Sequence, residues 1–525
     1  MLNVSSSYDY ENAKTRKHPV YIVEFENSSS FSTVPIGNHR PLLKGITGTA
    51  QSITPEEGKS SIGGYTAKIL DYNNEVTPLI SALHRRRATF RAGYRDMAET
   101  DFQTHFTGWV TDIKLSDDLT EYNVTFTDPL KWLQRKVFRG TESSTLNVAG
   151  NPINIMLAIM TSTGSASNGT YDFLDNANAL GISQSYMRIS HIEEERDRWF
   201  NGLYFTWNIR KREVAKTWLE QEIWKPLNIY PVIRGDGTFD IVHYHPPMPA
   251  IIDRDPLVLD RSVIIGNPKW DQNLPGMINE IEFNFDVNSA DEYGTTIWHI
   301  DADSINSRGP GKTVLQIDSQ GLTTAAGGED FVERRAAKVF LRYAEPPPKI
   351  TLKVFFNRHL AEAGDIVPVT HDKIPDIRLG VRGITSHYME VINRQVNHER
   401  GYCQFTLLDT SWRGENFGVV APTAIVSSGT GLTFAVRSGD GSKFRVNDVV
   451  NLCRVNMTVI ESAFTVGSIS GDTVTLTASM MTAPSSGNVL SYVDYDQATL
   501  QQKKYAFFAN SAQMMDGTNS AYLIY

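Results

Sequence analysis

The chain has 525 residues, of which 41% are hydrophobic and 21% are charged, so its composition excludes wholesale disorder and a fibrous architecture. This length predicts roughly three or four globular domains. Fifty Lys and Arg residues against 59 Asp and Glu residues give a formal net charge of −9, which argues against stable nucleic-acid binding by the surface as a whole. Three basic clusters, Lys14 to Lys17, Arg85 to Arg87 and Arg210 to Arg212, are either partner surfaces or solvated faces.

Neither stable membrane insertion nor classical export is expected. Apolar stretches such as Ile155 to Met160 are far shorter than the roughly 18 residues of a spanning helix, and the segment Met1 to Lys17 has no apolar signal core. The two cysteines, Cys403 and Cys453, form no C-x-x-C pair. We therefore expect buried free thiols rather than a disulfide framework, a zinc site or a redox site.

Residues 1–142 are predicted to form a β-domain that a small helix closes. Alternating apolar and polar residues mark its strands. The clearest strand patterns are Val20 to Phe25, Arg87 to Tyr94, Phe106 to Ile113 and Leu119 to Phe126. Asp128-Pro129 then begins a short helix through Leu133, because proline is tolerated in a first helical turn.

Residues 143–266 mix helix and strand patterns and are predicted to form a small α+β domain. Ile153 to Met160 and Glu213 to Trp224 have the apolar spacing of helices. Two alternating segments follow, and Gly235-Asp236-Gly237 between them predicts a hairpin.

Residues 267–415 return to strands and loosely repeat the organisation of the first domain. Glu329 to Tyr343 is predicted to be a helix that ends before three consecutive prolines. The predicted strands are Ile281 to Phe285, Ile350 to Phe356, Ile366 to Thr370, Gly380 to Ile392 and Cys403 to Leu408. The region is therefore interpreted as a second β-domain.

Residues 416–525 are predicted to form a small barrel or sandwich, because turn signals recur about every ten residues in a segment rich in Gly, Ser, Thr and Val. The short strand patterns are Leu432 to Val436, Val474 to Thr477 and Ala521 to Tyr525. Its aromatic side chains either stack on sugars or fill the core, and core packing is favoured. They include Phe434, Phe444, Phe464 and Tyr505.

Gly311-Lys312-Thr313 raises the possibility of a nucleotide-binding loop. Such a loop needs the pattern G-x-x-x-x-G-K-[ST], and Asn306 occupies the position of its first glycine. The loop must also begin a helix, whereas Val314 to Asp318 alternates like a strand. We therefore interpret the segment as a turn.

Two further clusters contain residue types that occur in functional sites. His243-Tyr244-His245 places two imidazoles on one face of a strand, but no further metal ligands are near, and the prolines that follow favour the surface end of a hairpin. Glu193-Glu194-Glu195 resembles a group of acid–base carboxylates, but Ser190 and Glu193 have the spacing of a capping box, which favours a helix start.

Motifs of known enzyme classes are absent from the sequence. Neither G-x-S-x-G nor H-E-x-x-H occurs, and neither cysteine has the context of a nucleophile. We assign no catalytic, cofactor-binding or metal-binding residue and expect no cofactor. A triad assembled from distant residues stays open, because such sites are defined in space.

Three stretches, the last in two parts, carry a resemblance to a known family. They are FTGWVTDIKLSDDLTEYNVTFTDPLKWLQRKV (Phe106 to Val137), LEQEIWKPLNIYPVIRGDGTFDIVHYHPP (Leu219 to Pro247), and AGDIVPVTH (Ala363 to His371) with YCQFTLLDTSW (Tyr402 to Trp412). Together they resemble the tail hub, or tail-tip, proteins of long-tailed bacteriophages and gene transfer agents. The pattern runs from about Val20 to Trp412.

The resemblance implies a mainly β, multi-domain protein with two tail-tube-like barrel or sandwich domains, 1–142 and 267–415, around an α+β insert, 143–266. The C-terminal β-domain, 416–525, would serve docking or carbohydrate binding. Three copies would form a ring of six tube-like domains at the virion tail tip. The protein would be made in the host cytoplasm.

Such a ring would join the tail tube and distal tail ring to the tip apparatus and open for genome ejection. The implied partners are two further copies, tail tube and distal tail proteins, the tape measure protein, and tail fibre or receptor-binding proteins. DNA would pass through the channel without being held, because an acidic chain repels phosphates where its acids face inward.

The chain departs from some members of this group. Some hold an iron–sulfur cluster through cysteines, but two cysteines cannot supply four thiolate ligands. Others carry a peptidoglycan-cleaving or peptidase domain, and residues 421–525 show neither catalytic pattern. Two alternatives stay open, a glycan- or receptor-binding adhesin of the tail tip and a tail-associated cell-wall hydrolase whose site no motif marks.

Overall fold

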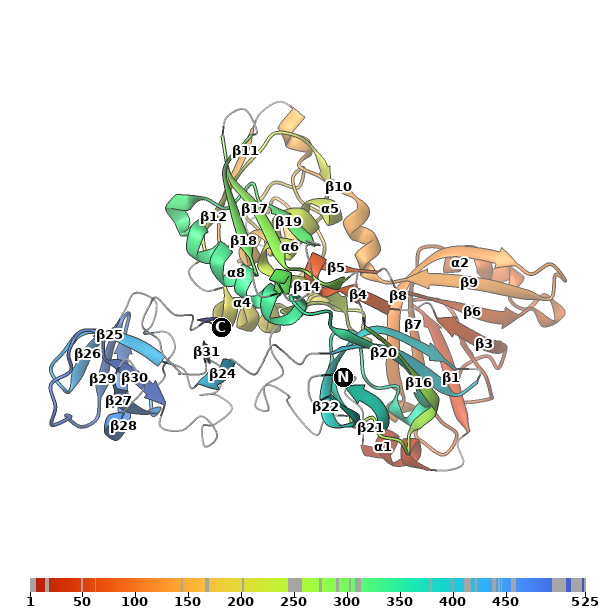
Figure 1. Cartoon of the computed structure of the whole chain (residues 1–525). Coiled ribbons are helices and arrows are strands. Elements are labelled where there is room, and N and C mark those ends of the chain that lie inside the picture. Colours follow the sequence, from red (N-terminus) through yellow and green to blue (C-terminus); the bar gives the residue numbers. More distant parts are fainter. Residues whose placement is uncertain are drawn as a thin grey trace.

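The fold is described from a computed structural model of the chain. The structure describes residues 6–14, 18–48, 51–61, 63–142, 145–165, 170–200, 203–243, 257–272, 276–288, 292–301, 304–306, 313–377, 380–398, 400–409, 417–420, 423–436, 441, 444, 446–454, 459–492, 507–510 and 522–523. Most of the elements are strands, distributed over several sheets, and the protein is β-rich and multi-domain as the sequence predicted (Figure 1).

The first sheet has seven antiparallel strands in the order β2-β1-β7-β8-β9-β6-β3. The strands are β1 (Pro19–Phe25), β2 (Ser30–Ser32), β3 (Leu43–Gly48), β6 (Gly64–Leu70), β7 (Arg87–Tyr94), β8 (Gln103–Leu115) and β9 (Glu121–Thr127). One face of the sheet is apolar, and Phe90, Phe106 and Phe126 are among the side chains that pack there. This alternation is what the sequence predicted for the region.

The second sheet also has seven strands, and two of them come from the N-terminal region. Its order is β16-β20-β23-β22-β4-β5, with β21 paired to β22. The strands are β4 (Gln51–Thr54), β5 (Lys59–Ser60), β16 (Ile264–Gln272), β20 (Pro348–Phe355), β21 (Ile366–Asp376), β22 (Val381–Asn397) and β23 (Tyr402–Asp409). Because β4 pairs with β22 at Ser52 and Asn393, the chain crosses from one sheet into the other.

A central body of helices and small sheets lies beside the two large sheets (Figure 1). Its helices are α3 (Pro152–Thr161), α4 (Ile189–Trp199), α5 (Ala215–Leu219), α6 (Lys225–Leu227) and α8 (Gly328–Tyr343). Its strands are β10 (Lys136–Val137), β11 (Leu146–Gly150), β12 (Phe205–Ile209), β13 (Glu213–Val214), β14 (Ile229–Ile233), β15 (Phe239–His243), β17 (Glu280–Val287), β18 (Tyr293–Ile300) and β19 (Val314–Asp318).

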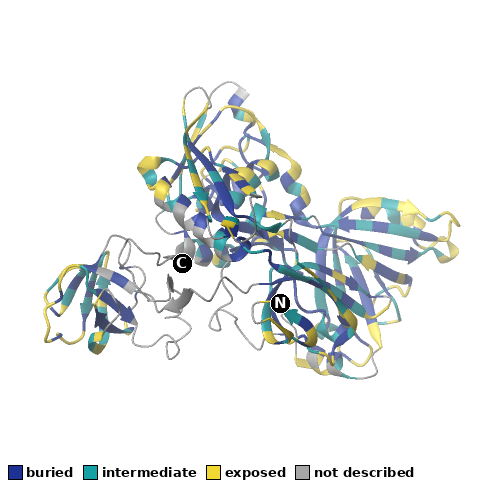
Figure 2. Cartoon of the chain, in the orientation of Figure 1, coloured by how far each residue is buried: buried dark blue, intermediate teal, exposed yellow. Residues whose placement is uncertain are grey.

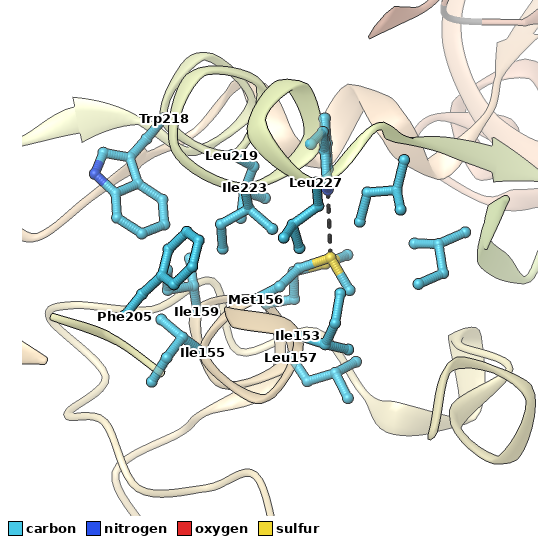
Figure 3. Packing of buried hydrophobic residues seen from close by; sticks show 14 of the residues in the cluster. Ile153, Ile155, Met156, Leu157, Ile159, Phe205, Trp218, Leu219, Ile223 and Leu227 are labelled. Atoms are coloured by element: carbon cyan, nitrogen blue, oxygen red, sulfur yellow. Dashed lines mark hydrogen bonds between the residues drawn. The ribbon is translucent and has the colours of Figure 1, made fainter. Parts of the chain in front are cut away.

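One hydrophobic cluster holds this body together, and α3 is buried along almost its whole length. Figure 3 shows Met156 of α3 packed under Leu219, Ile223 and Leu227. The indole Nε1 of Trp224 donates a hydrogen bond to the Met156 sulfur at 3.3 Å. The cluster draws on residues before and after the predicted division at 266/267. The domain boundaries stay a prediction, and we propose that residues 130–243 and 278–343 form one folding unit.

The C-terminal region forms a closed six-stranded barrel in the order β25-β26-β29-β28-β27-β30. Its strands are β25 (Thr423–Gly429), β26 (Thr433–Val436), β27 (Val449–Cys453), β28 (Val459–Ser470), β29 (Thr473–Leu476) and β30 (Val489–Tyr492). A separate small sheet contains β24 (Phe417–Val420), β31 (Phe507–Asn510) and β32 (Tyr522–Leu523). The sequence predicted a barrel or sandwich, and closure removes the exposed edges of the barrel strands.

Local predictions held best where one apolar pattern dominates. The hairpin around Gly235-Asp236-Gly237 is formed by β14 and β15. The predicted helix over Glu213 to Trp224 begins with the short strand β13 and contains a π-helical turn at Glu220–Trp224. The short helix after Asp128 is a 3-10 helix, Pro129–Gln134, with Asp128 accepting a hydrogen bond from Leu130 N.

Buried positions form the interior of both large sheets and of the central body (Figure 2). Among the described residues, we find no helix with both the length and the apolarity to cross a membrane.

We predict that Glu222→Gln stabilises the protein above pH 7. Glu222 is 4% exposed, and its Oε2 accepts hydrogen bonds from Trp207 Nε1 at 3.1 Å and Gln320 N at 2.8 Å. Burial raises the pKa of this carboxyl to about 7. The folded state therefore keeps the Glu222 proton up to a pH of about 7, whereas the unfolded chain releases it near the ordinary pKa of a glutamate. The free energy of unfolding decreases as the pH rises between these two pKa values.

The glutamine side chain keeps the hydrogen bonds and removes this ionisation. We expect thermal unfolding by calorimetry to show a gain of about 3 kcal/mol for Glu222→Gln at pH 8 and a much smaller one at pH 5. Glu220→Gln is the matched control, because Glu220 pairs with Lys216 at 3.5 Å and remains partly exposed. Equal gains at both pH values would contradict the prediction.

Candidate functional site

The two large sheets meet at a buried contact that we call the seam. It consists of Tyr8, His105, His359, Arg394 and His398 together with the aromatic rings around them. Each of the five is at most 5% exposed. The seam contains residues from both predicted tail-tube-like regions, so it fixes how the two sheets lie relative to one another.

Three histidine rings form the centre of the seam. The rings of His105, from β8, and His359, from the second β-region, are stacked with centroids 4.8 Å apart. His398 follows β22 and stands edge-on to His105 at 5.8 Å and to Phe90 at 5.0 Å. Both ring nitrogens of His398 lack a hydrogen-bond partner within the described residues.

The helix α1 (Ser6–Ala13) contributes a tyrosine that bridges the two sheets. The hydroxyl oxygen of Tyr8 lies 3.2 Å from His105 Nε2 and 3.1 Å from His359 Nε2. On the same helix, Asn12 Nδ2 donates to Asn357 O at 3.0 Å, and its Oδ1 accepts from Tyr94 at 2.6 Å. The first helix is therefore fastened to both sheets at once.

Hydrogen bonds from side chains to backbone complete the seam. Arg394 of β22 donates through Nε and Nη2 to the carbonyl oxygen of His359 at 3.2 and 2.8 Å. From the first sheet, Tyr21 donates its hydroxyl to the carbonyl oxygen of His398 at 3.2 Å. Because these bonds join sequence-distant segments in a water-poor environment, they define one relative position of the sheets.

The seam favours neutral imidazoles. Burial, together with the charges of His359, His398 and Arg394, lowers the pKa of His105 well below its ordinary value, and burial, His359 and Arg394 do the same for His398. The carboxylate of Glu362 lies near enough to the seam to influence Tyr65 electrostatically. It is already engaged, because it accepts a hydrogen bond from Gly235 N and lies 3.7 Å from Arg234. Protonation of the seam would thus add positive charge beside Arg394.

A second buried contact joins the central body to the second sheet. Tyr230 of β14 donates to Glu390 Oε1 at 2.5 Å, and Arg342 of α8 pairs with Glu390 Oε2. Glu390 belongs to β22, four residues before Arg394. All of these side chains are at most 4% exposed, so β22 connects the central body and the first sheet through buried polar contacts.

Several predicted site residues have positions that differ from expectation. His243 was expected at a surface, but it is 2% exposed at the end of β15, against Phe200, and Tyr244 and His245 lie outside the described residues. Gly311 and Lys312 also lie outside the described residues. The prediction of a capping box is wrong, because Ser190 lies inside α4. The N-cap residue of α4 is Arg188, and its side chain makes no capping hydrogen bond.

Other predictions are confirmed. Cys403 and Cys453 are buried free thiols, and burial raises their pKa values to about 12 and about 11, which keeps them protonated at neutral pH. Phe434 and Phe444 lie in the barrel core, as core packing required, and Phe464 packs against it. Tyr505 lies outside the described residues.

One cluster that the sequence did not suggest has the donors of a metal site. Ligand atoms of Glu24, His39 and Glu99 lie within 4.8 Å of one another. Arg91 Nη1 lies 3.1 Å from Glu24 Oε1 and 3.6 Å from Glu99 Oε1. The arginine already supplies the positive charge, so the cluster is an ion-pair network.

We predict that His398→Phe reduces the acid sensitivity of the protein. The unfolded chain takes up a proton near pH 6.5, whereas the folded state keeps His398 neutral, so stability is lost as the pH falls below the unfolded pKa. Between pH 7.5 and 5.0 this histidine costs wild type about 2 kcal/mol. Phenylalanine fills a similar volume without titrating.

Urea unfolding of wild type and His398→Phe at both pH values gives the change in their difference in free energy of unfolding. Other titrating groups contribute equally to both proteins and cancel in this difference; one of them is Asp128, whose pKa burial raises to about 7. His398→Asn is a second variant in case phenylalanine does not fit. The exposed His84, replaced by Gln, is the control. A pH-independent difference between wild type and both His398 variants would show that His398 does not titrate in this way.

No family model matches the chain, and no curated protein matches it. Among solved structures, the 43 kDa tail protein of prophage MuSo2 from Shewanella oneidensis is 10% identical with a TM-score of 0.41, over 74% of this chain and 98% of that one. The prophage tail protein gp18 from Listeria monocytogenes is 10% identical with a TM-score of 0.36, over 74% and 94%.

The Francisella PdpA-VgrG complex in its lidded form is 9% identical with a TM-score of 0.37, over 97% of this chain and 81% of that one. Two of these neighbours are prophage tail proteins, and the third is a PdpA-VgrG complex. With TM-scores below 0.5, the likeness alone assigns the chain neither a family nor an activity.

Proposed function

We propose that this chain is a structural protein of a phage tail, without enzymatic activity. In this proposal it is the hub at the distal end of the tail, where three copies form a ring that joins the tail tube and distal tail ring to the tip apparatus. The ring opens for genome ejection. Its location is the virion tail tip.

The observation that carries the proposal is the pair of seven-stranded sheets locked together by the seam within one chain. Two sheets per chain and three chains make 2 × 3 = 6 sheets, so a trimer supplies the same number of β-units as a sixfold tube. The strand crossing through β4 and the bridge through Tyr8 hold each pair in one geometry. Ring closure then buries sheet edges that would otherwise be exposed.

We place part of the contact between copies on the outer side of the sheet β18-β17-β19. Trp298 and Ile300 of β18 are 51% and 48% exposed, and Val314 of β19 is 45% exposed. Ile300 and Val314 both register with Glu280 of β17, so they lie across the same position of the sheet. Exposed apolar side chains on edge strands, such as Trp298 and Ile300 on β18, are typical of a surface that another protein covers.

The remaining partners follow from the same proposal. The ring meets the tail tube and distal tail proteins on one side and tape measure and fibre or receptor-binding proteins at the tip. DNA passes through the channel in transit only, and the net charge of −9 supports this, because acidic walls do not retain phosphates.

We predict that the purified protein forms a trimer and that Trp298→Lys weakens it. Light scattering is expected to give a mass close to three times 58.7 kDa for wild type, and negative-stain images of the same peak a ring with a central hole. A lysine charge at position 298 would be desolvated in the contact, which is unfavourable. We therefore expect the dissociation constant of the trimer to rise at least tenfold. Met481→Lys, at a fully exposed position of the barrel region, is the control.

The proposal fails if the protein is a monomer under all conditions and particles that lack it still assemble complete tails. A stable trimer that Trp298→Lys leaves intact would retain the hub and remove Trp298 from its contact.

A further inference from the structure

A surface pocket of about 470 Å³ lies on the central body, away from the seam. One side is formed by the segment around β10, with Arg135, Lys136 and Arg139. The other side is formed by Ser162 and Thr163, directly after α3, and by residues 176 and 179–181. A pocket of this size accommodates a small organic molecule rather than a macromolecular duplex.

The charged side chains that line this pocket are all positive. Arg135, Lys136 and Arg139 form no ion pair with any described carboxylate, although the chain as a whole has a net charge of −9. Burial and the positive charge of Arg139 lower the pKa of Arg135. The fold thus holds like charges together at an open pocket, which is unfavourable unless an anion joins them.

Two of the nearby acids, Asp172 and Glu213, are engaged elsewhere. Asp172 is 8% exposed and accepts hydrogen bonds from Thr163 N at 2.8 Å, Thr163 Oγ1 at 2.8 Å and Gly164 N at 3.2 Å. Glu213, which pairs with Val137 across β10 and β13, lies 3.3 Å from Lys211. These carboxylates shape the surroundings of the pocket and do not neutralise its cations.

The position of Arg135 is fixed by the backbone. Its Nη2 donates to Leu180 O at 2.9 Å, and its Nε donates to Trp132 O at 3.3 Å. A guanidinium held in one position loses little conformational entropy when it binds a ligand, and guanidinium groups match the geometry of phosphate oxygens. Arg139 is anchored only through its backbone, where its N–H donates to Ala177 O at 2.9 Å, so its side chain is available.

We propose that this pocket binds a phosphate ester of a sugar or small polyol. The two arginines and the lysine bind the phosphate, and the remaining volume beside Thr163 and residues 179–181 takes the attached group. Phosphate binding requires no covalent step and does not depend on the proposed role in the tail.

Calorimetric titration of the full-length protein tests this site with three probes: inorganic phosphate, glucose 6-phosphate and glucose. In about 50 mM salt, where charges are weakly screened, glucose 6-phosphate is expected to bind more tightly than inorganic phosphate, and glucose not at all. Arg139→Gln and Lys136→Gln are each expected to weaken glucose 6-phosphate binding about tenfold. Arg85→Gln, which makes the same charge change at an exposed position outside the pocket, is expected to leave it unchanged.

Melting temperatures equal to wild type would establish that the variants are folded. Absence of heat with both phosphate compounds would overturn the site, as would equal binding by wild type and both pocket variants. Binding of inorganic phosphate without glucose 6-phosphate would overturn the assignment to an ester. None of these results depends on whether the protein is a trimer, so failure of the pocket and failure of the hub are distinguishable.

Discussion

The strand β22 is the element on which the rest of this structure depends. Over its 17 residues it pairs with β21, β23 and β4. Glu390 in this strand contacts the central body through Tyr230 and Arg342. Arg394, four residues further along, donates to the backbone carbonyl of His359. A shift of register by one residue would turn both side chains to the opposite face, so backbone pairing and buried polar contacts specify the same arrangement.

The seam is unusual for a contact between two sheets because buried polar side chains lie at its centre. Hydrophobic side chains would hold the sheets with less desolvation cost, because buried charges and polar groups are expensive unless their hydrogen bonds are made. Arg394 and Tyr8 have their hydrogen bonds, whereas the two ring nitrogens of His398 have no partner in the part of the chain that the structure describes. Such a contact is specific at neutral pH and sensitive to protonation.

Much of the fold was predictable, because strands and helices here follow local apolar periods. The strands β1, β7, β8, β9 and β23 and the helices α3 and α8 all match patterns of alternation or of helical spacing. The capping prediction failed because Ser190 and Glu193 match a local motif whose geometry also depends on where the helix begins, and Arg188 precedes the first turn instead. The seam was not predictable at all, since its residues form no motif and the contact between Tyr8 and His359 joins positions 351 residues apart.

The sequence by itself determined the β-rich, multi-domain class, a barrel or sandwich at the C-terminus and the state of the cysteines. Each of these depends on neighbours within a few residues or on composition. Only the tertiary structure decided that β4 and β5 join the second sheet, that Tyr8 bridges His105 and His359, and that Arg135, Lys136 and Arg139 meet at one pocket. The physical reason is that long-range pairing and burial are properties of the whole chain, because each buried polar group takes its partner from whichever segment packing brings beside it.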